Sequence, residues 1–195
     1  MRNSKFLTGI ISIAAVFTLS ACAENGDHTH TPNEDSTNIE MNEGHGSHDG
    51  MNHSGSGEVP KDLAVAENPT YPVDSQAIIQ TDHMKGMQGA VGIITGAYTT
   101  TVYSVSYTPT TGGEQVKDHK WVIHEEIDKH GEEPFKEGDE VTLRADHMEG
   151  MDGATAVIDS AEATTVYMVN YKDTESGEEV TNHKWVTEAE LSPVE

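Results

Sequence analysis

Residues 82–90 read D-H-M-K-G-M-Q-G-A, and residues 146–154 read D-H-M-E-G-M-D-G-A. The same offset of 64 positions joins V-K-D-H-K-W-V at 116–122 to V-T-N-H-K-W-V at 180–186 without a gap. An internal repeat decides the fold, because each copy must supply the same structural unit. We therefore expect two copies of one unit, at residues 71–127 and 135–191.

Each copy has the pattern of short strands. Apolar and polar residues alternate at 77–79 and at 141–143, which predicts a half-buried first strand. A second strand is expected at 90–95 and 154–159, and a third follows with Tyr103, Val105 and Tyr107 on one face. Turn sequences at 110–114 and 175–178 lead into a fourth strand with the H-K-W-V motif, and short helical turns are expected at 124–128 and 187–191. This pattern favours an all-β fold of two tandem small SH3-like barrels after a disordered tether.

The N-terminus predicts export and lipid anchoring. Arg2 and Lys5 precede an apolar stretch at residues 6–19, as in a signal peptide at residues 1–21. L-S-A-C at 19–22 resembles a bacterial lipoprotein box, which would make Cys22 the lipidated residue. The alternative is an ordinary signal peptide followed by a chance cysteine. Lipidation at Cys22 would hold the protein on the extracytoplasmic face of the cell membrane.

Residues 22–68 lack any sustained hydrophobic period and are rich in Gly, Ser, Asn, Asp, Glu and His. Such a segment buries too little apolar surface to offset the entropy of ordering, so we predict a disordered tether. One turn of helix is expected near its end, at residues 61–66.

The chain is strongly acidic, with 34 Asp and Glu residues against 11 Lys and Arg residues. A formal net charge of −23 repels nucleic acid, whose binding proteins carry basic patches. We therefore exclude nucleic acid as a partner.

Two groups of residues could bind metal. The first lies in the tether, where a solvated linker with incidental histidines is the alternative, and consists of His28, His30, His45, His48, Met51 and His53. The second lies in the repeats and consists of His83, Met84, Met87, His147, Met148 and Met151, with His119 and His183 as weaker candidates. Imidazole suits Cu(II), Zn and Ni, while the methionine thioether selects Cu(I), so copper as Cu(I) is the favoured ion. The alternatives are that the methionines pack in a core or shape a loop, and that a histidine beside a buried tryptophan is part of the core.

Other chemistry finds little support. The sequence has no C-x-x-C pair, no H-E-x-x-H and no G-x-S-x-G, so neither a structural zinc site nor a hydrolase is predicted. We expect no enzyme activity and no organic cofactor.

The doubled H-M-x-G-M-x-G-A block, followed by T-T-V-Y-x-V-x-Y and H-K-W-V, resembles the YdhK family of bacterial envelope lipoproteins over about residues 71–191. Some members of that family resemble copper-binding lipoproteins of copper-resistance loci. The resemblance implies a membrane-anchored protein that sequesters copper for tolerance, with an envelope protein or a copper transporter as partner. The alternative function is an interaction module that holds the cell wall or an envelope protein, with Trp121 and Trp185 as aromatic contacts.

Overall fold

The computed structural model describes residues 54–195, in which there are eight strands, two 3-10 turns and no α-helix. The strands are β1 (Ala64–Val65), β2 (Gln76–Ile79), β3 (Val91–Tyr107), β4 (Val116–Ile123), β5 (Glu140–Thr142), β6 (Thr155–Lys172), β7 (Glu179–Thr187) and β8 (Leu191–Pro193). They form one sheet with the path β5-β6-β3-β2-β8, in which β1 and β4 pair with β3 and β7 pairs with β6. The prediction of an all-β fold built from two repeats is confirmed. In this part of the chain no helix has the length and hydropathy to cross a bilayer.

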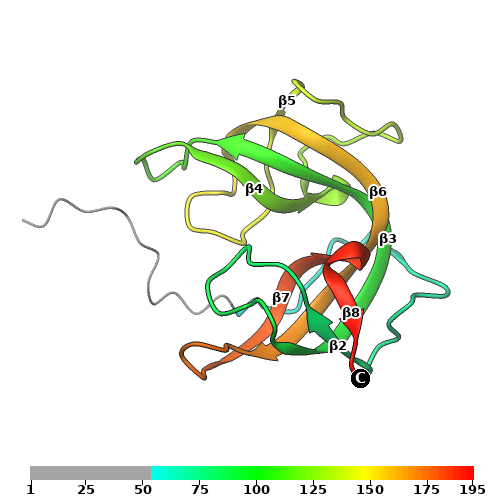
Figure 1. The fold of residues 1–195 in the computed structure, drawn as a ribbon. Coiled ribbons are helices and arrows are strands. Elements are labelled where there is room, and N and C mark those ends of the chain that lie inside the picture. The colour runs from blue at the N-terminus through cyan, green and yellow to red at the C-terminus, as the bar shows by residue number, and fades with distance from the viewer. Residues whose placement is uncertain (1–53) are drawn as a thin grey trace, which may run out of the picture. The chain divides into compact units, whose positions relative to one another are not determined.

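The centre of the sheet is the antiparallel pair of β3 and β6, which Figure 1 shows as two curved strands side by side. The predicted second and third strands of each repeat are one continuous strand here, and the expected break between them is wrong. The intervening residues are rich in Thr, Tyr and Val, which favour extended backbone. Register shifts at Ile94/Gly96 and Ser104/Val105 bend the pair without ending it.

The register of this pair relates the two repeats by an approximate twofold axis. Thr100 lies opposite Thr164, its own counterpart in the other repeat. On either side, Ala97 faces Tyr167 and Tyr103 faces Ala161, which is the same pairing with the repeats exchanged. The axis therefore passes through the Thr100–Thr164 pair.

Two hydrophobic cores flank the axis, and each one draws residues from both repeats. The first core packs Ile79, Met87 and Ile94 of the first repeat against Tyr167 and Val186 of the second. The second core is the counterpart, and its buried members are Tyr103, Val105, Tyr107, Val122 and Ile127 from the first repeat with Val141, Leu143, Ala145, Met151, Ala154, Ala156 and Ile158 from the second. Burial of one large apolar side chain stabilises a fold by about 1.5–3 kcal/mol, so each repeat stabilises the other.

A third cluster lies between these cores and contains both tryptophans. Trp121 and Trp185 are 9% and 0% exposed, and they pack with Val102 and Val166. Leu63, which precedes the first repeat, is 7% exposed in the same cluster.

Residues 54–68, the described part of the predicted tether, make regular contacts with the sheet. Strand β1 pairs with β3, and the amide of Gly55 donates to the carbonyl of Thr181 at 2.8 Å. The helical turn expected at 61–66 is wrong, because Ala64 and Val65 form β1. The physical reason is that buried Leu63 anchors this segment to the third cluster.

Each repeat ends in a single 3-10 turn, η1 (His124–Glu126) or η2 (Glu188–Glu190). These turns agree with the short helical turns predicted at 124–128 and 187–191. They place Glu126 and Glu190 at equivalent positions, directly after the strands that carry the H-K-W-V motif.

Candidate metal centre

The H-M-x-G-M-x-G-A block forms a tight loop in each repeat, and its two methionines point into different surroundings. In the second repeat the amide of Met151 donates to the carbonyl of Met148 at 3.2 Å, and Gly150 has a φ of +75°, a left-handed conformation that glycine adopts at low cost. Met151 is fully buried in the second core, while Met148 is only partly buried at its margin. The loop therefore places the sulfur atom of Met151 in the core and leaves that of Met148 accessible.

The first repeat repeats this arrangement. Gly86 has a φ of +77°, and the amide of Met87 donates to the carbonyl of Met84 at 3.2 Å. Met87 is fully buried in the first core, and Met84 is partly buried at its margin.

The histidine of each loop is held by a carboxylate of the other repeat. Nε2 of His147 lies 2.8 Å from Oε1 of Glu126, and Nε2 of His83 lies 2.6 Å from Oε1 of Glu190. The side chains of His147 and His83 are 8% and 9% exposed, so both contacts are nearly closed to solvent. Each repeat thus makes a histidine–glutamate hydrogen bond to the other repeat, in addition to sharing its hydrophobic core with it.

The other oxygen of each carboxylate accepts from a tryptophan and from backbone. Nε1 of Trp185 donates to Oε2 of Glu126 at 3.0 Å, and the amide of Ile123 donates to the same atom at 3.2 Å. Nε1 of Trp121 donates to Oε2 of Glu190 at 2.9 Å, as does the amide of Thr187 at 2.9 Å. The two indoles therefore act as donors inside the fold.

These contacts keep both carboxylates ionised. Burial raises the pKa of Glu126, but the charge and hydrogen bond of His147, with the indole of Trp185, outweigh burial and hold that pKa below its usual value. For Glu190 burial also acts upward, yet the hydrogen bond and charge of His83 and the other donors lower the pKa to about 2.

Three imidazole nitrogens are buried without a hydrogen-bond partner among the described residues, namely Nδ1 of His83, Nδ1 of His147 and Nε2 of His119. Burial, followed by the charges of His147 and His83, lowers the pKa of His119 to about 4. His119 is therefore neutral at neutral pH. The rings of His119 and His147 lie 6.3 Å apart, centroid to centroid. Nitrogen atoms of this kind are costly to bury unless something binds them.

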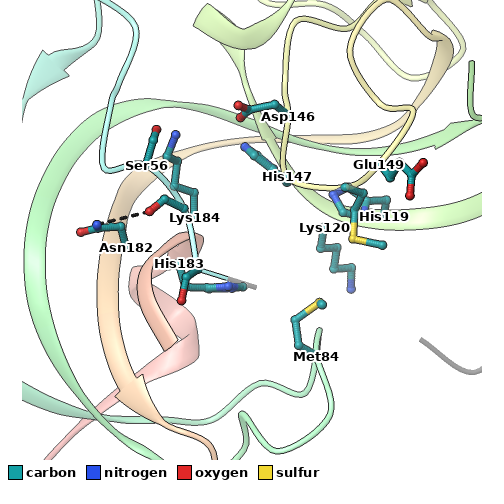
Figure 2. A pocket seen from close by; sticks show the side chains of 13 residues that line it. Ser56, Met84, His119, Lys120, Asp146, His147, Glu149, Asn182, His183 and Lys184 are labelled. Carbon is teal, nitrogen blue, oxygen red and sulfur yellow. Dashed lines mark hydrogen bonds between the residues drawn. The ribbon is translucent and has the colours of Figure 1, made fainter. Parts of the chain in front are cut away.

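A pocket of about 330 Å³ opens beside these rings, and we call it the His-Met pocket. Figure 2 shows Met84 reaching into it from one side, with His147 and His119 on the other and His183 nearby. Its lining comprises Ser54, Gly55, Ser56, Met84, His119, Lys120, Asp146, His147, Met148, Glu149, Asn182, His183 and Lys184.

Five of the residues predicted from the sequence therefore meet at this pocket: Met84, Met148, His119, His147 and His183. His83 contacts Glu190 and lies with its ring 6.0 Å from that of Trp121. Met87 and Met151 have the core packing that was the alternative to ligation. The tether residues His28, His30, His45, His48, Met51 and His53, together with Cys22, lie outside the described residues.

Between residues 54 and 195, no three side chains among His, Cys, Asp and Glu are grouped so that they could hold a metal ion. Two imidazoles with thioethers beside them are a different donor set, and this is the set that the His-Met pocket brings together.

Sequence reasoning missed Glu126 and Glu190, the carboxylates that hold the two loop histidines. The signal was present, because the two glutamates stand at the same offset as the loops and the H-K-W-V motifs. In a chain with 34 Asp and Glu residues, a glutamate that recurs at the repeat offset is not distinctive unless its histidine partner is known.

Comparisons with known proteins agree with the repeated architecture. A family model described as "Protein of unknown function (DUF1541)" matches residues 73–124 and again residues 137–188. The chain is 54% identical over 195 residues to the uncharacterized protein YdhK of Bacillus subtilis strain 168, across 98% of this chain and 91% of that protein.

Solved structures of the same relative are also similar. The crystal structure of the DUF1541 family protein ydhK from Bacillus subtilis, at 2.00 Å resolution, matches with a TM-score of 0.73 and 61% identity, over 75% of this chain and 100% of that one. A solution NMR structure of the ydhK C-terminal domain from Bacillus subtilis matches with a TM-score of 0.60 and 64% identity, over 62% of this chain and 92% of that one. Both repeats and most of the chain are covered, and the chain therefore belongs to the DUF1541 family.

Proposed function

We propose that this protein is a lipid-anchored, copper-binding protein of the extracytoplasmic face of the membrane, which sequesters Cu(I) in the His-Met pocket. The lipoprotein-like sequence at 19–22 supports the location, with Cys22 as the anchor. The histidines at 28, 30, 45, 48 and 53 and Met51 would add further ligands for the same ion.

A single observation carries the proposal of metal binding. Nδ1 of His147 and Nε2 of His119 are both buried and without a partner among residues 54–195, next to a pocket that Met84 and Met148 also line. A bare imidazole nitrogen is a metal ligand, and a carboxylate on the other ring nitrogen is the usual support of such a ligand. Glu126 supplies that support to His147.

The donor set favours Cu(I) over harder ions. Imidazole alone suits several divalent metals, but thioethers select soft ions, of which Cu(I) is the common biological case. The proposed site takes its first two donors from His119 and His147 and its further donor from Met84 or Met148. His183 lines the same pocket and stands close to these donors.

The interaction-module alternative is less well supported. It required the tryptophan rings to lie in a surface groove, whereas Trp121 and Trp185 are 9% and 0% exposed. Their indole N–H groups donate hydrogen bonds to Glu190 and Glu126 inside the fold. Cell-wall binding through these rings would need the third cluster to open.

The test is competition for Cu(I) between a colorimetric chelator and the full chain in detergent. To isolate the pocket, the tether histidines at 28, 30, 45, 48 and 53 are replaced by asparagine and Met51 by leucine. In that background the double variant M84L/M148L should raise the Kd for Cu(I) at least about tenfold, which is about 1.4 kcal/mol of binding free energy.

The matched control is M87L/M151L, which changes the other methionine of each loop. Both are core side chains, and a volume-conserving exchange of Met for Leu costs a core less than about 1.5 kcal/mol, so this variant should fold and keep its affinity. Equal affinity for all variants would remove the pocket as the site. Absence of Cu(I) uptake by the unmodified chain would remove the function.

A further inference from the structure

We infer that Glu126 and Glu190 are positioning residues that set the tautomers of His147 and His83 in the opposite repeat, and that Glu126 thereby leaves Nδ1 of His147, a residue that lines the His-Met pocket, as the metal-binding nitrogen. This role deepens, and rests on, the copper binding proposed above. Its structural content is a tautomer choice, which exists whether or not a metal is bound.

The hydrogen bonds leave only one tautomer of His147 satisfied. A carboxylate only accepts hydrogen bonds, so Nε2 of His147 must carry the proton that lies between it and Oε1 of Glu126, 2.8 Å away. A proton on Nδ1 would have no acceptor among the described residues in a side chain that is 8% exposed. In the neutral form of the ring, Nδ1 therefore keeps its lone pair and is the donor atom.

The same logic repeats about the twofold axis. Oε1 of Glu190 lies 2.6 Å from Nε2 of His83, whose Nδ1 is again buried and unpartnered within residues 54–195. The same hydrogen-bond pattern, crossing from one repeat to the other, therefore occurs twice in the fold.

Replacement of Glu126 by glutamine turns this choice around. Oε2 of Glu126 receives two obligatory donors, Nε1 of Trp185 and the amide of Ile123. An amide nitrogen cannot accept from them, so the carbonyl oxygen of Gln must stay on that side and its NH₂ group must face His147. Nε2 of His147 then accepts, Nδ1 takes the proton, and the nitrogen proposed as the metal donor loses its lone pair.

The experiment uses the full chain in detergent, with ¹⁵N-labelled histidine and no metal, and reads each imidazole tautomer from long-range proton–nitrogen NMR correlations. The unmodified chain should have His147 and His83 protonated at Nε2. E126Q should move the proton of His147 to Nδ1 and leave His83 unchanged, and E190Q should do the reverse. The control is E125Q, because Glu125 contacts Thr100 and not a pocket histidine.

Cu(I) affinity is the second readout. Loss of an outer-shell partner of a metal ligand typically lowers metal affinity about 10–100-fold, so we expect a loss of that size in E126Q and none in E125Q. A tautomer change without loss of affinity would overturn the role of Glu126 in metal binding, while copper binding itself would stand.

Two further outcomes separate the claims. Protonation of Nδ1 in the unmodified chain, or an unchanged tautomer in folded E126Q, would overturn the inference whatever the chain binds. If the unmodified chain takes up no Cu(I), the proposed function fails, and the tautomers still decide whether the carboxylates orient the rings.

Discussion

Two glycines of one loop allow a sharp test of how the repeats are joined. Gly150 and Gly153 have φ values of +75° and +77°, so replacement by alanine imposes the same backbone penalty at each. That penalty is roughly 1–2 kcal/mol for an L-residue in the left-handed region. The two positions differ in what a new Cβ atom would contact.

At Gly153 a Cβ atom meets nothing within 4 Å. At Gly150 it would lie 2.7 Å from Oγ1 of Thr111 and 2.9 Å from Cβ of Pro109, on the hairpin of the other repeat. The carbonyl of Gly150 also accepts the amide of Thr110 at 2.8 Å, and this contact would be displaced. Overpacking typically costs about 1–3 kcal/mol.

We therefore expect G153A to lower the free energy of unfolding by about 1–2 kcal/mol and G150A by about 2–5 kcal/mol. Urea titration followed by the fluorescence of the buried tryptophans measures both. G150A should also weaken Cu(I) binding more than G153A, because His147 and Met148 lie only three and two residues before Gly150 in the same loop. Equal destabilisation by the two variants would refute the close contact between the loop and the opposite hairpin.

Three further predictions concern stability and pH. M151A should lower the free energy of unfolding by about 2–5 kcal/mol, because Met151 is fully buried, and M148A should lower it by clearly less. Urea titration measures both, and equal losses would contradict the assignment of Met151 to the core and Met148 to the pocket. The pKa of Glu190 is lowered from 4.5 to about 2, so the stabilisation of the fold by its carboxylate is present above pH 4.5 and is lost as the pH falls toward 2. The difference in unfolding free energy between the unmodified chain and E190Q should therefore narrow over that range by about 1–2 kcal/mol, which is less than the pKa shift alone would give because some solvent reaches the carboxylate. A difference that stays constant with pH would count against this. Burial raises the pKa values of Tyr167 and Tyr171 to about 12, so both phenols should stay protonated in the folded protein at pH 10, where an exposed phenol titrates. The contribution of these two protonated phenols to the stability of the fold should be lost as the pH rises from 10 toward 12. Phenolate absorbance measures this, and titration of all phenols near pH 10 in the folded protein would contradict it.

The sequence predicted the strand class and the repeat because both follow from local pattern. Alternation at 77–79 and the H-K-W-V motif depend only on neighbouring residues, and both strands formed. The 3-10 turns at Glu126 and Glu190 were predicted for the same reason.

Which repeat completes which core was beyond the sequence. Two copies of one pattern present the same apolar faces, so Ile94 finds a suitable partner in Val105 of its own repeat or in Val169 of the other. Only the register of β3 against β6, with Thr100 opposite Thr164, decides the choice, and register is a property of the assembled sheet.

The roles of the loop methionines were also hidden. Met148 and Met151 are three residues apart in a turn, and the turn geometry alone sends one to the core and one to the pocket. The supporting glutamates could not be assigned, because their partners lie in the opposite repeat.

The self-matched register of β3 and β6 bears on how such a chain arises. Strands β3 and β6 are equivalent segments of the two repeats and pair with each other about a twofold axis. The central contact of a symmetric homodimer has the same geometry, because the same surface of each subunit forms the interface. Joining two such subunits by a short linker, here the residues between Ile127 and Phe135, gives a single polypeptide with the same contacts. A gene encoding one repeat alone would on this basis yield an associating protein, whose stability would depend on its concentration.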